Sequence, residues 1–208
     1  MLTPKQIRVF GAFLRRPYKE LTYRQIKEFS KEKSNSVIQK AIAKFIEEDL
    51  VKKREVGNMF LYAVNVKNTQ TLAYFGILIP EKLPHLAKLA LRRIQQELAG
   101  VPFASIVVFG SHVEGKQTEK SDLDVAIFVN SEKDKKNCEL SMNAAEIRIV
   151  IPLDTHVFLK EEMLQMLKDP DENLGKQIAR KHFAIQNPLI FYAILEEGIT
   201  NGFKFEYS

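Results

Sequence analysis

A polar loop between two short apolar runs, within residues 106–129, is the feature that most constrains the fold of this chain. The runs before Gly110 and after Asp124 are β-branched and aromatic, which predicts two buried strands. Asp122 and Asp124 stand two residues apart where the second strand begins. An extended backbone places both carboxylates on one face, where they repel each other. A positive group is therefore expected beside them.

The chemistry of this loop indicates what that positive group is. Carboxylate oxygens are hard ligands and favour Mg²⁺ or Mn²⁺. Gly110 and Ser111 open the loop and permit a tight turn with exposed backbone N–H groups, which suit an anion such as a phosphate. The sequence thus predicts a divalent cation next to a phosphate cradle.

Gly-Ser, ten intervening residues and then Asp-x-Asp between apolar runs resembles the signature of the nucleotidyltransferase (polymerase β-like) superfamily, and most of all its minimal archaeal and bacterial members. The resemblance implies a third carboxylate on a neighbouring strand, for which Asp154 in the apolar run 147–159 is the candidate. It also implies that Asp122, Asp124 and Asp154 form a catalytic site that binds Mg²⁺ or Mn²⁺. Gly110 and Ser111 would bind the phosphates of ATP or another NTP.

The reaction implied is transfer of a nucleoside monophosphate to a hydroxyl acceptor on a protein, an RNA or a small molecule, with release of pyrophosphate. The chain departs from the family pattern after Gly-Ser, where His112 and Glu114 replace the usual basic residues. Glu114 would repel a triphosphate, and Lys116 and Lys120 in the same loop would compensate. Two alternatives to an enzyme therefore stay open for this domain: a non-catalytic nucleotide sensor and a dimerisation module.

The first 66 residues are basic, with 14 Lys and Arg against 7 Asp and Glu, whereas the rest of the chain has a net charge of −2. Apolar spacing predicts helices over residues 3–16, 23–30 and 34–49, capped by Thr3, Thr22 and Ser34. Strands are expected over residues 50–56 and 59–64, joined by a tight turn at Gly57-Asn58.

Three helices followed by a hairpin resemble a winged helix-turn-helix, which implies binding to double-stranded DNA. Residues of the third helix would face the major groove and residues of the hairpin would contact phosphates. The candidate DNA-binding residues are Ser34, Asn35, Ser36, Gln39, Lys40, Lys44, Lys52, Lys53 and Arg54. The alternative is that these lysines form a solvated face or that the domain mediates dimer contacts.

The expected fold class is α+β. A winged helix domain over residues 1–70 precedes a nucleotidyltransferase domain over residues 81–208, in which helices flank a mixed sheet and form a C-terminal tail. One helix is expected over residues 81–99, and three more over residues 159–167, 171–184 and 188–197. As a whole, the chain is expected to be a DNA-binding nucleotidyltransferase or a transcriptional regulator. An antitoxin-like partner of a second protein is a further alternative. A homodimer is compatible with a DNA-binding protein, because operators are often palindromic.

The composition of the chain indicates its cellular location. No apolar run approaches the ~18 residues that a membrane span needs. The N-terminal residues lack the pattern of a signal peptide, and Cys138 is the single cysteine, which excludes an intramolecular disulfide framework. A cytoplasmic protein without a membrane partner is expected.

Overall fold

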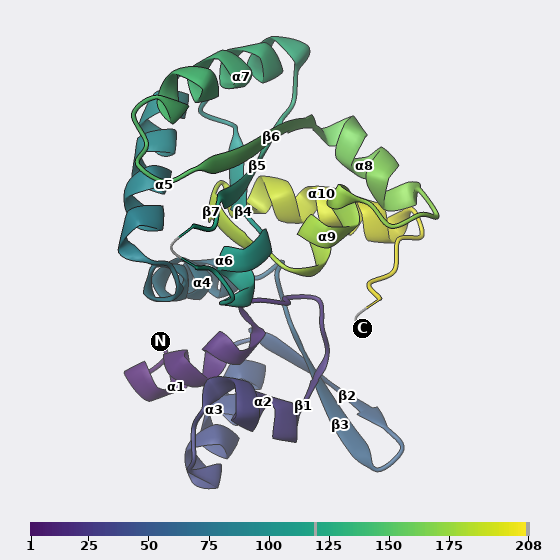
Figure 1. Cartoon of the computed structure of the whole chain (residues 1–208). Helices are drawn as coiled ribbons and strands as arrows, with labels where there is room; N and C mark the ends of the chain where they lie inside the picture. The colour runs from purple at the N-terminus through teal and green to yellow at the C-terminus, as the bar shows by residue number, and fades with distance from the viewer. Residues whose placement is uncertain (119, 207–208) are drawn as a thin grey trace. The chain divides into compact units, whose positions relative to one another are not determined.

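The computed structural model describes residues 1–118 and 120–206, which form two compact units, Met1–Glu81 and Lys82–Glu206 (Figure 1). Both units combine helices with a β-sheet, which agrees with the expected α+β class. None of the helices in the described part of the chain is long and apolar enough to span a membrane.

The first unit contains three short helices, a 3₁₀ turn, a small antiparallel sheet and a longer helix. Its sheet has the strand order β1-β3-β2. The elements are α1 (Pro4–Phe10), η1 (Gly11–Phe13), β1 (Leu21–Thr22), α2 (Tyr23–Ser30), α3 (Asn35–Glu47), β2 (Val51–Val56), β3 (Met59–Val64) and α4 (Thr69–Lys82).

Local sequence signals account for most of these boundaries. Thr3 and Thr22 each form a capping box with the glutamine three residues later, and Ser34 accepts a hydrogen bond from the Val37 N–H. The three predicted caps are confirmed. The expected hairpin is also present, with Gly57 at φ +57° in the turn between β2 and β3.

An aromatic cluster forms the core of this unit. The Phe10 ring lies 5.0 Å from Phe45 and 5.6 Å from Phe75, measured between ring centroids. Helix α4 contributes Phe75 to the cluster. This helix was not predicted, because its apolar residues lie all around the helix axis and show no amphipathic period.

The start of the helix expected over residues 81–99 is wrong. Residues 81 and 82 belong to the end of α4, and the next helix, α5, begins only at His85. Pro84 stands directly before α5, because proline lacks the N–H that the interior of a helix needs.

The second unit is a four-stranded mixed sheet covered by helices. The sheet order is β6-β5-β4-β7, with β5 and β6 parallel and the other pairs antiparallel. The elements are α5 (His85–Glu97), η2 (Leu98–Gly100), β4 (Ser105–Val108), α6 (Gly110–Glu114), β5 (Leu123–Val129), α7 (Glu132–Glu146), β6 (Leu153–Leu159), α8 (Lys160–Lys168), α9 (Leu174–Arg180), β7 (Phe183–Gln186) and α10 (Pro188–Thr200).

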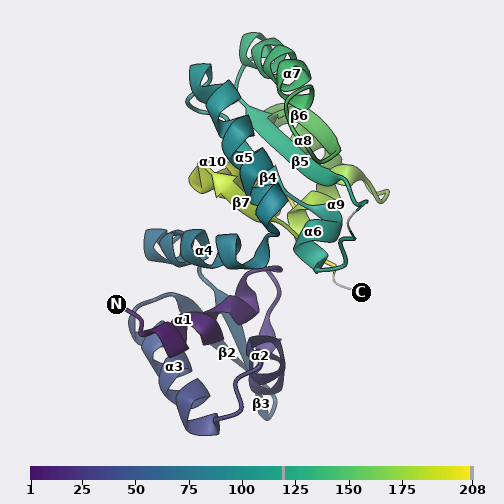
Figure 2. The same cartoon turned by 60° about the vertical axis from the view of Figure 1, so that its left-hand side comes forward.

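Helices lie on both faces of this sheet. Figure 2 shows α5 and α7 on one face and α8, α9 and α10 on the other. Phe128 of β5 packs against Phe158 of β6 and Phe191 of α10, with ring centroids 5.8 and 5.0 Å away. These rings mark the face of the sheet that α10 covers.

The C-terminal tail differs from the sequence expectation in two ways. A helix was expected over residues 171–184, but α9 ends at Arg180 and β7 follows, because Phe183 and Ala184 pair with β4. Gly198 was expected to end the last helix, yet α10 continues to Thr200. Gly198 instead permits close packing, since a Cβ atom there would lie 2.6 Å from Leu167 Cδ1.

Candidate functional site

The register of the mixed sheet brings two of the predicted carboxylates together. Asp124 near the start of β5 and Asp154 near the start of β6 are direct partners across a parallel strand pair. Partners in register project their side chains to the same face, and adjacent strands lie about 4.8 Å apart. Asp122 precedes β5 by one residue and is exposed. The chain thus places two carboxylates opposite each other and a third close by in sequence.

The surroundings of Asp124 disfavour its ionised form. Burial raises its pKa, and the negative charges of Asp154 and Asp122 raise it further. The Ser111 backbone N–H and His112 act in the opposite direction. A carboxylate that is half-buried and faces like charges is stabilised by a bound cation.

Gly110 lies directly against this carboxylate. Its φ of +66° is left-handed, and a Cβ atom there would stand 2.1 Å from Asp124 Oδ2. The predicted turn at Gly110 is therefore confirmed, and it continues into the five-residue helix α6. The Lys116 N–H donates to the Ser111 carbonyl at 3.1 Å and returns the chain toward the start of α6. Lys120 is exposed, and its N–H donates to Thr118 Oγ1.

Glu114, at the end of α6, forms ion pairs with two lysines. Lys116 Nζ lies 3.0 Å from one carboxylate oxygen, and Lys181 Nζ contacts the other. Hydrogen bonds from Lys181 and Lys116 lower the pKa of Glu114 to about 2. Lys181 and Glu114 are 67 positions apart in the sequence, and no local pattern indicates their contact.

Two histidines flank the carboxylates. His156 Nε2 lies 3.1 Å from Asp154 Oδ1, and the His156 ring stacks on Phe158 with an interplanar angle of 11°. His112 is only 5 % exposed, and burial lowers its pKa, whereas the negative charge of Asp124 raises it. The His112 side chain therefore packs inside the unit.

The comparison with protein families covers this same part of the chain. A family model described as "Polymerase beta, Nucleotidyltransferase" matches residues 93–200, which is just over half of the sequence. The chain belongs to this family. The matched segment of this nucleotidyltransferase domain spans all four strands of the mixed sheet, the Gly110 turn and the three carboxylates. No curated protein and no solved structure gave a significant match.

Two carboxylates of the nucleotidyltransferase domain have the chemistry of ligands to a divalent cation. Within residues 1–118 and 120–206, no three His, Cys, Asp or Glu side chains are arranged as a ready-made metal site. Mg²⁺ is usually held by one or two carboxylates together with substrate phosphates and water. The opposed pair Asp124 and Asp154, with the unfavourable charge at Asp124, matches that type of ligand set.

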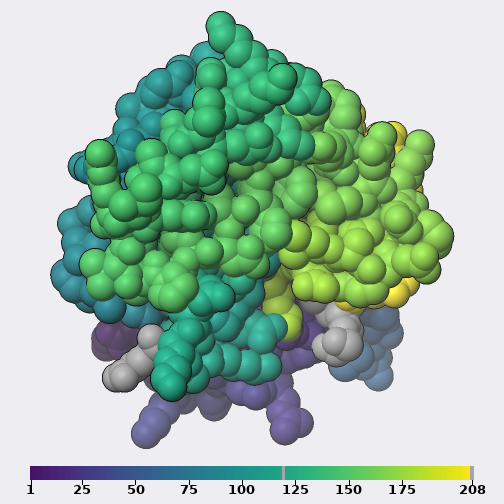
Figure 3. Space-filling model, turned by 45° about the horizontal axis from the view of Figure 1, so that its top comes forward, coloured from purple at the N-terminus to yellow at the C-terminus, as the bar shows by residue number. Residues whose placement is uncertain are grey.

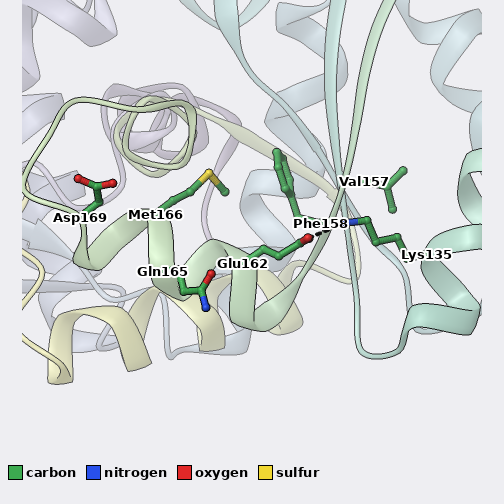
Figure 4. A pocket seen from close by; sticks show the side chains of 7 residues that line it. All are labelled: Lys135, Val157, Phe158, Glu162, Gln165, Met166 and Asp169. Carbon is green, nitrogen blue, oxygen red and sulfur yellow. Dashed lines mark hydrogen bonds and ion pairs between the residues drawn. The ribbon is translucent and has the colours of Figure 1, made fainter.

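A separate hollow lies at the other end of β6. A pocket of about 390 Å³ lies between β6, α7 and α8. Lys135 and Glu162 form an ion pair across it, with Nζ 2.6 Å from Oε1, and Figure 4 shows their side chains directed toward each other. Val157, Phe158 and Met166 contribute apolar surface to it. The described residues that line this pocket do not include the candidate carboxylates, so it is distinct from the site.

The candidate DNA-binding residues of the first unit are mostly exposed, but several already have partners. Ser34 caps α3, and Asn35, Ser36, Gln39 and Lys40 are exposed along that helix. The Asn35 side chain accepts a hydrogen bond from the Lys27 ammonium group. Lys44 forms ion pairs with Glu47 and Glu48. The Arg54 guanidinium group donates two hydrogen bonds to the Glu20 carboxylate. Lys52 and Lys53 are exposed on β2, with Lys53 Nζ 3.5 Å from the Phe60 ring centroid.

Proposed function

We propose that this protein transfers a nucleoside monophosphate from an NTP, such as ATP, to a hydroxyl acceptor and releases pyrophosphate. The observation that carries the proposal is the register partnership of Asp124 and Asp154 beside Gly110, inside a domain of the nucleotidyltransferase family. Asp122, Asp124 and Asp154 are assigned to the cation site. Gly110, Ser111, Lys116 and Lys120 are assigned to the triphosphate.

Each residue has a distinct task in this proposal. The carboxylates hold the cation, and their mutual repulsion in its absence favours its uptake. Gly110 leaves room for Asp124 and, with Ser111, lets the backbone approach the phosphates. Mg²⁺ or Mn²⁺, when bound, neutralises charge on the phosphates and activates the α-phosphorus. The acceptor hydroxyl gives its proton to solvent as its oxygen bonds to that phosphorus, the bond to the oxygen that bridges the α- and β-phosphates breaks, and pyrophosphate departs.

Incubation of the full chain with ATP labelled at the α-phosphate tests this function. Label is expected to appear on a protein or RNA acceptor together with released pyrophosphate. Asp124→Asn and Asp154→Asn are each expected to reduce transfer at least ~100-fold, because each removes a charge that the transition state needs. Glu139→Gln, an exposed carboxylate on α7, is the matched control. Equal transfer by wild type and both Asp variants would refute the mechanism, and ATP binding without turnover would favour a nucleotide sensor.

We further propose that the first unit binds double-stranded DNA as a winged helix domain. Its support is the element order α1-β1-α2-α3-β2-β3, with sheet order β1-β3-β2 and exposed polar and basic side chains on α3 and β2. Helix α3 would enter the major groove and the hairpin would contact phosphates. Because Lys44 and Arg54 are paired within the chain, Lys40, Lys52 and Lys53 are the cations best placed for DNA.

Fluorescence anisotropy with a labelled DNA duplex at several salt concentrations tests this second proposal. Replacing Lys52 and Lys53 by alanine is expected to weaken binding and to reduce the slope of log affinity against log salt by about 1 to 2. Lys5→Ala, an exposed lysine on α1, serves as the control for loss of a single charge. Absence of binding at low salt would refute DNA binding by this unit.

A further inference from the structure

The ion-paired cluster after the Gly110 turn contains more positive than negative charge. Glu114 carries one carboxylate and contacts the ammonium groups of Lys116 and Lys181. The side chains are 26 % exposed for Glu114, 34 % for Lys181 and 77 % for Lys116. An ammonium group has three donors, so each lysine retains donors for a second acceptor while it contacts Glu114.

This cluster lies close to the carboxylate site through helix α6. Gly110 and Glu114 are four residues apart and therefore on the same side of that helix, about 6 Å apart along its axis. Gly115, at φ +71°, ends the helix and directs Lys116 back to the Ser111 carbonyl. Since Gly110 lies against Asp124, Glu114 is within about one helical turn of the proposed cation site, and Lys116 and Lys181 contact Glu114.

Lys181 joins this cluster from a segment 67 positions further along the chain than Glu114. It follows α9 and precedes β7, which pairs with β4, the strand that leads into Gly110. In the space-filling view of Figure 3, the teal segment after β4 and the yellow-green segment around residue 180 meet at the surface. The neighbouring cations on α9 have other partners, because Lys176 donates to the Asp171 carbonyl and Arg180 pairs with Glu172.

We propose that Lys181 is a triphosphate-binding residue, acting with Lys116, and that Glu114 is a positioning residue that holds both ammonium groups before the nucleotide arrives. The inference rests on the proposed nucleotidyl transfer and adds a phosphate ligand to it. It also explains an acidic residue in a place where it would otherwise repel the substrate. Glu114 is neutralised by two lysines, and the cluster presents a net positive charge to the phosphates.

Isothermal titration of the full chain with ATP, AMP and tripolyphosphate provides the test. Lys181→Met is expected to weaken binding of ATP and tripolyphosphate about 10- to 100-fold, the size of a hydrogen bond to a charged group, and to leave AMP binding within about 2-fold. The KM for ATP is expected to rise by the same factor with little change in kcat. Lys176→Met is the matched control and is expected to bind ATP as the wild type does.

A charge swap separates phosphate binding from a merely structural ion pair. The double variant Glu114→Lys with Lys181→Glu restores an opposite-charge pair between the same positions. We expect it to recover part of the urea midpoint that Lys181→Met loses, since Lys116 is left without its partner, but not the affinity for ATP. Recovery of both would overturn the proposal, because the pair would then serve only the fold. Glu114→Gln is expected to weaken ATP binding about 3- to 10-fold, since Lys181 loses its anchor.

The outcomes distinguish this inference from the proposed function. If the wild type binds ATP and transfers label while Lys181→Met is unchanged in both, the role of Lys181 is refuted and nucleotidyl transfer stands. If the wild type neither binds ATP nor transfers label, both are refuted. A loss of ATP binding by Lys181→Met that the charge-swap variant does not recover supports the proposal.

Discussion

At Gly110 two separate requirements exclude a residue with a Cβ atom. The backbone is left-handed at φ +66°, which costs an L-residue roughly 1–2 kcal/mol. In addition, the Asp124 carboxylate occupies the space that the Cβ atom would need. The turn and the carboxylate are thus one structural unit, in which the smallest residue permits the charged one to be half-buried.

Gly110→Ala is therefore expected to lower the free energy of unfolding by about 2 kcal/mol or more and to abolish transfer, because Asp124 must move. Urea unfolding and the label-transfer assay measure the two effects. Gly100→Ala is the control in the same unit, since a Cβ atom there meets no atom within 4 Å and its φ is not left-handed. A Gly110→Ala variant with normal stability and activity would contradict the geometry.

The raised pKa of Asp124 predicts a conflict between stability and function. Burial disfavours its ionised form, so its favourable contribution to folding is present at low pH and is lost as pH rises through the raised pKa. Asp124→Asn is therefore expected to increase the free energy of unfolding by about 1 kcal/mol at pH 7 and to have little effect below about pH 4. Urea titrations at pH 7 and pH 3.5 compare the variants, and a destabilised Asn variant at pH 7 would refute this account.

The contribution of Glu114 to stability depends on pH in the opposite direction to that of Asp124. Its lysine partners lower its pKa to about 2, so its stabilising contribution is full above the ordinary glutamate pKa and disappears as pH falls toward 2. Glu114→Gln is expected to cost about 1 kcal/mol at pH 7, after allowance for solvent screening, and almost nothing near pH 2. The same urea titrations, extended to pH 2, measure this difference, and a cost that persists at pH 2 would point to lost packing instead.

At the scale of elements, helix α2 shows how local capping sets a boundary. The Thr22 side chain accepts from the Gln25 N–H, and the Gln25 side chain accepts from the Thr22 N–H. The left-handed Lys31, at φ +56°, ends the helix. Both ends of α2 are therefore defined by residues within a few positions of it.

Thr22→Ala is expected to destabilise the first unit by about 1 kcal/mol, because the N–H groups of the first turn lose their acceptor. Thermal unfolding followed by circular dichroism measures the loss. Thr22→Ser retains the acceptor and is expected to stay close to the wild type. A loss of equal size in both variants would show that the methyl group of Thr22, rather than its hydroxyl, matters.

At the scale of the whole molecule, the two units have separate cores and separate candidate sites. Phe10, Phe13 and Phe45 are fully buried in the first unit, and Phe128 and Phe191 in the second. All three candidate carboxylates belong to the second unit, and the candidate DNA-binding residues to the first. Substitutions at such distinct sites are generally additive.

Asp124→Asn is consequently expected to abolish transfer with less than a 2-fold change in DNA affinity. The double variant with Lys52 and Lys53 replaced by alanine is expected to weaken DNA binding and to leave transfer unchanged. Anisotropy and titration with ATP on each variant test this independence. A change in DNA affinity when ATP is added to the wild type, but not to Asp124→Asn, would contradict independence and would instead indicate a nucleotide-dependent regulator.

What the sequence determined by itself was local. The caps Thr3, Thr22 and Ser34, the hairpin turn at Gly57 and the apolar strands around Gly110 are each encoded within a few residues. Hydrogen bonds between neighbouring residues and the two-residue period of strands suffice to define them. The spacing of Gly-Ser and Asp-x-Asp belongs to the same class of signal, and it indicates the family by itself.

Only the tertiary structure decided which distant residues meet. The partnership of Asp124 with Asp154 depends on the register of β5 and β6, and a shift of one residue would turn Asp154 to the other face. Strand β7 forms where a helix was expected because β4 offers an edge to pair with. Lys181 reaches Glu114 for the same reason. Such contacts join residues 30 to 80 positions apart, and the packing of the whole sheet selects them, so no short stretch of sequence contains them.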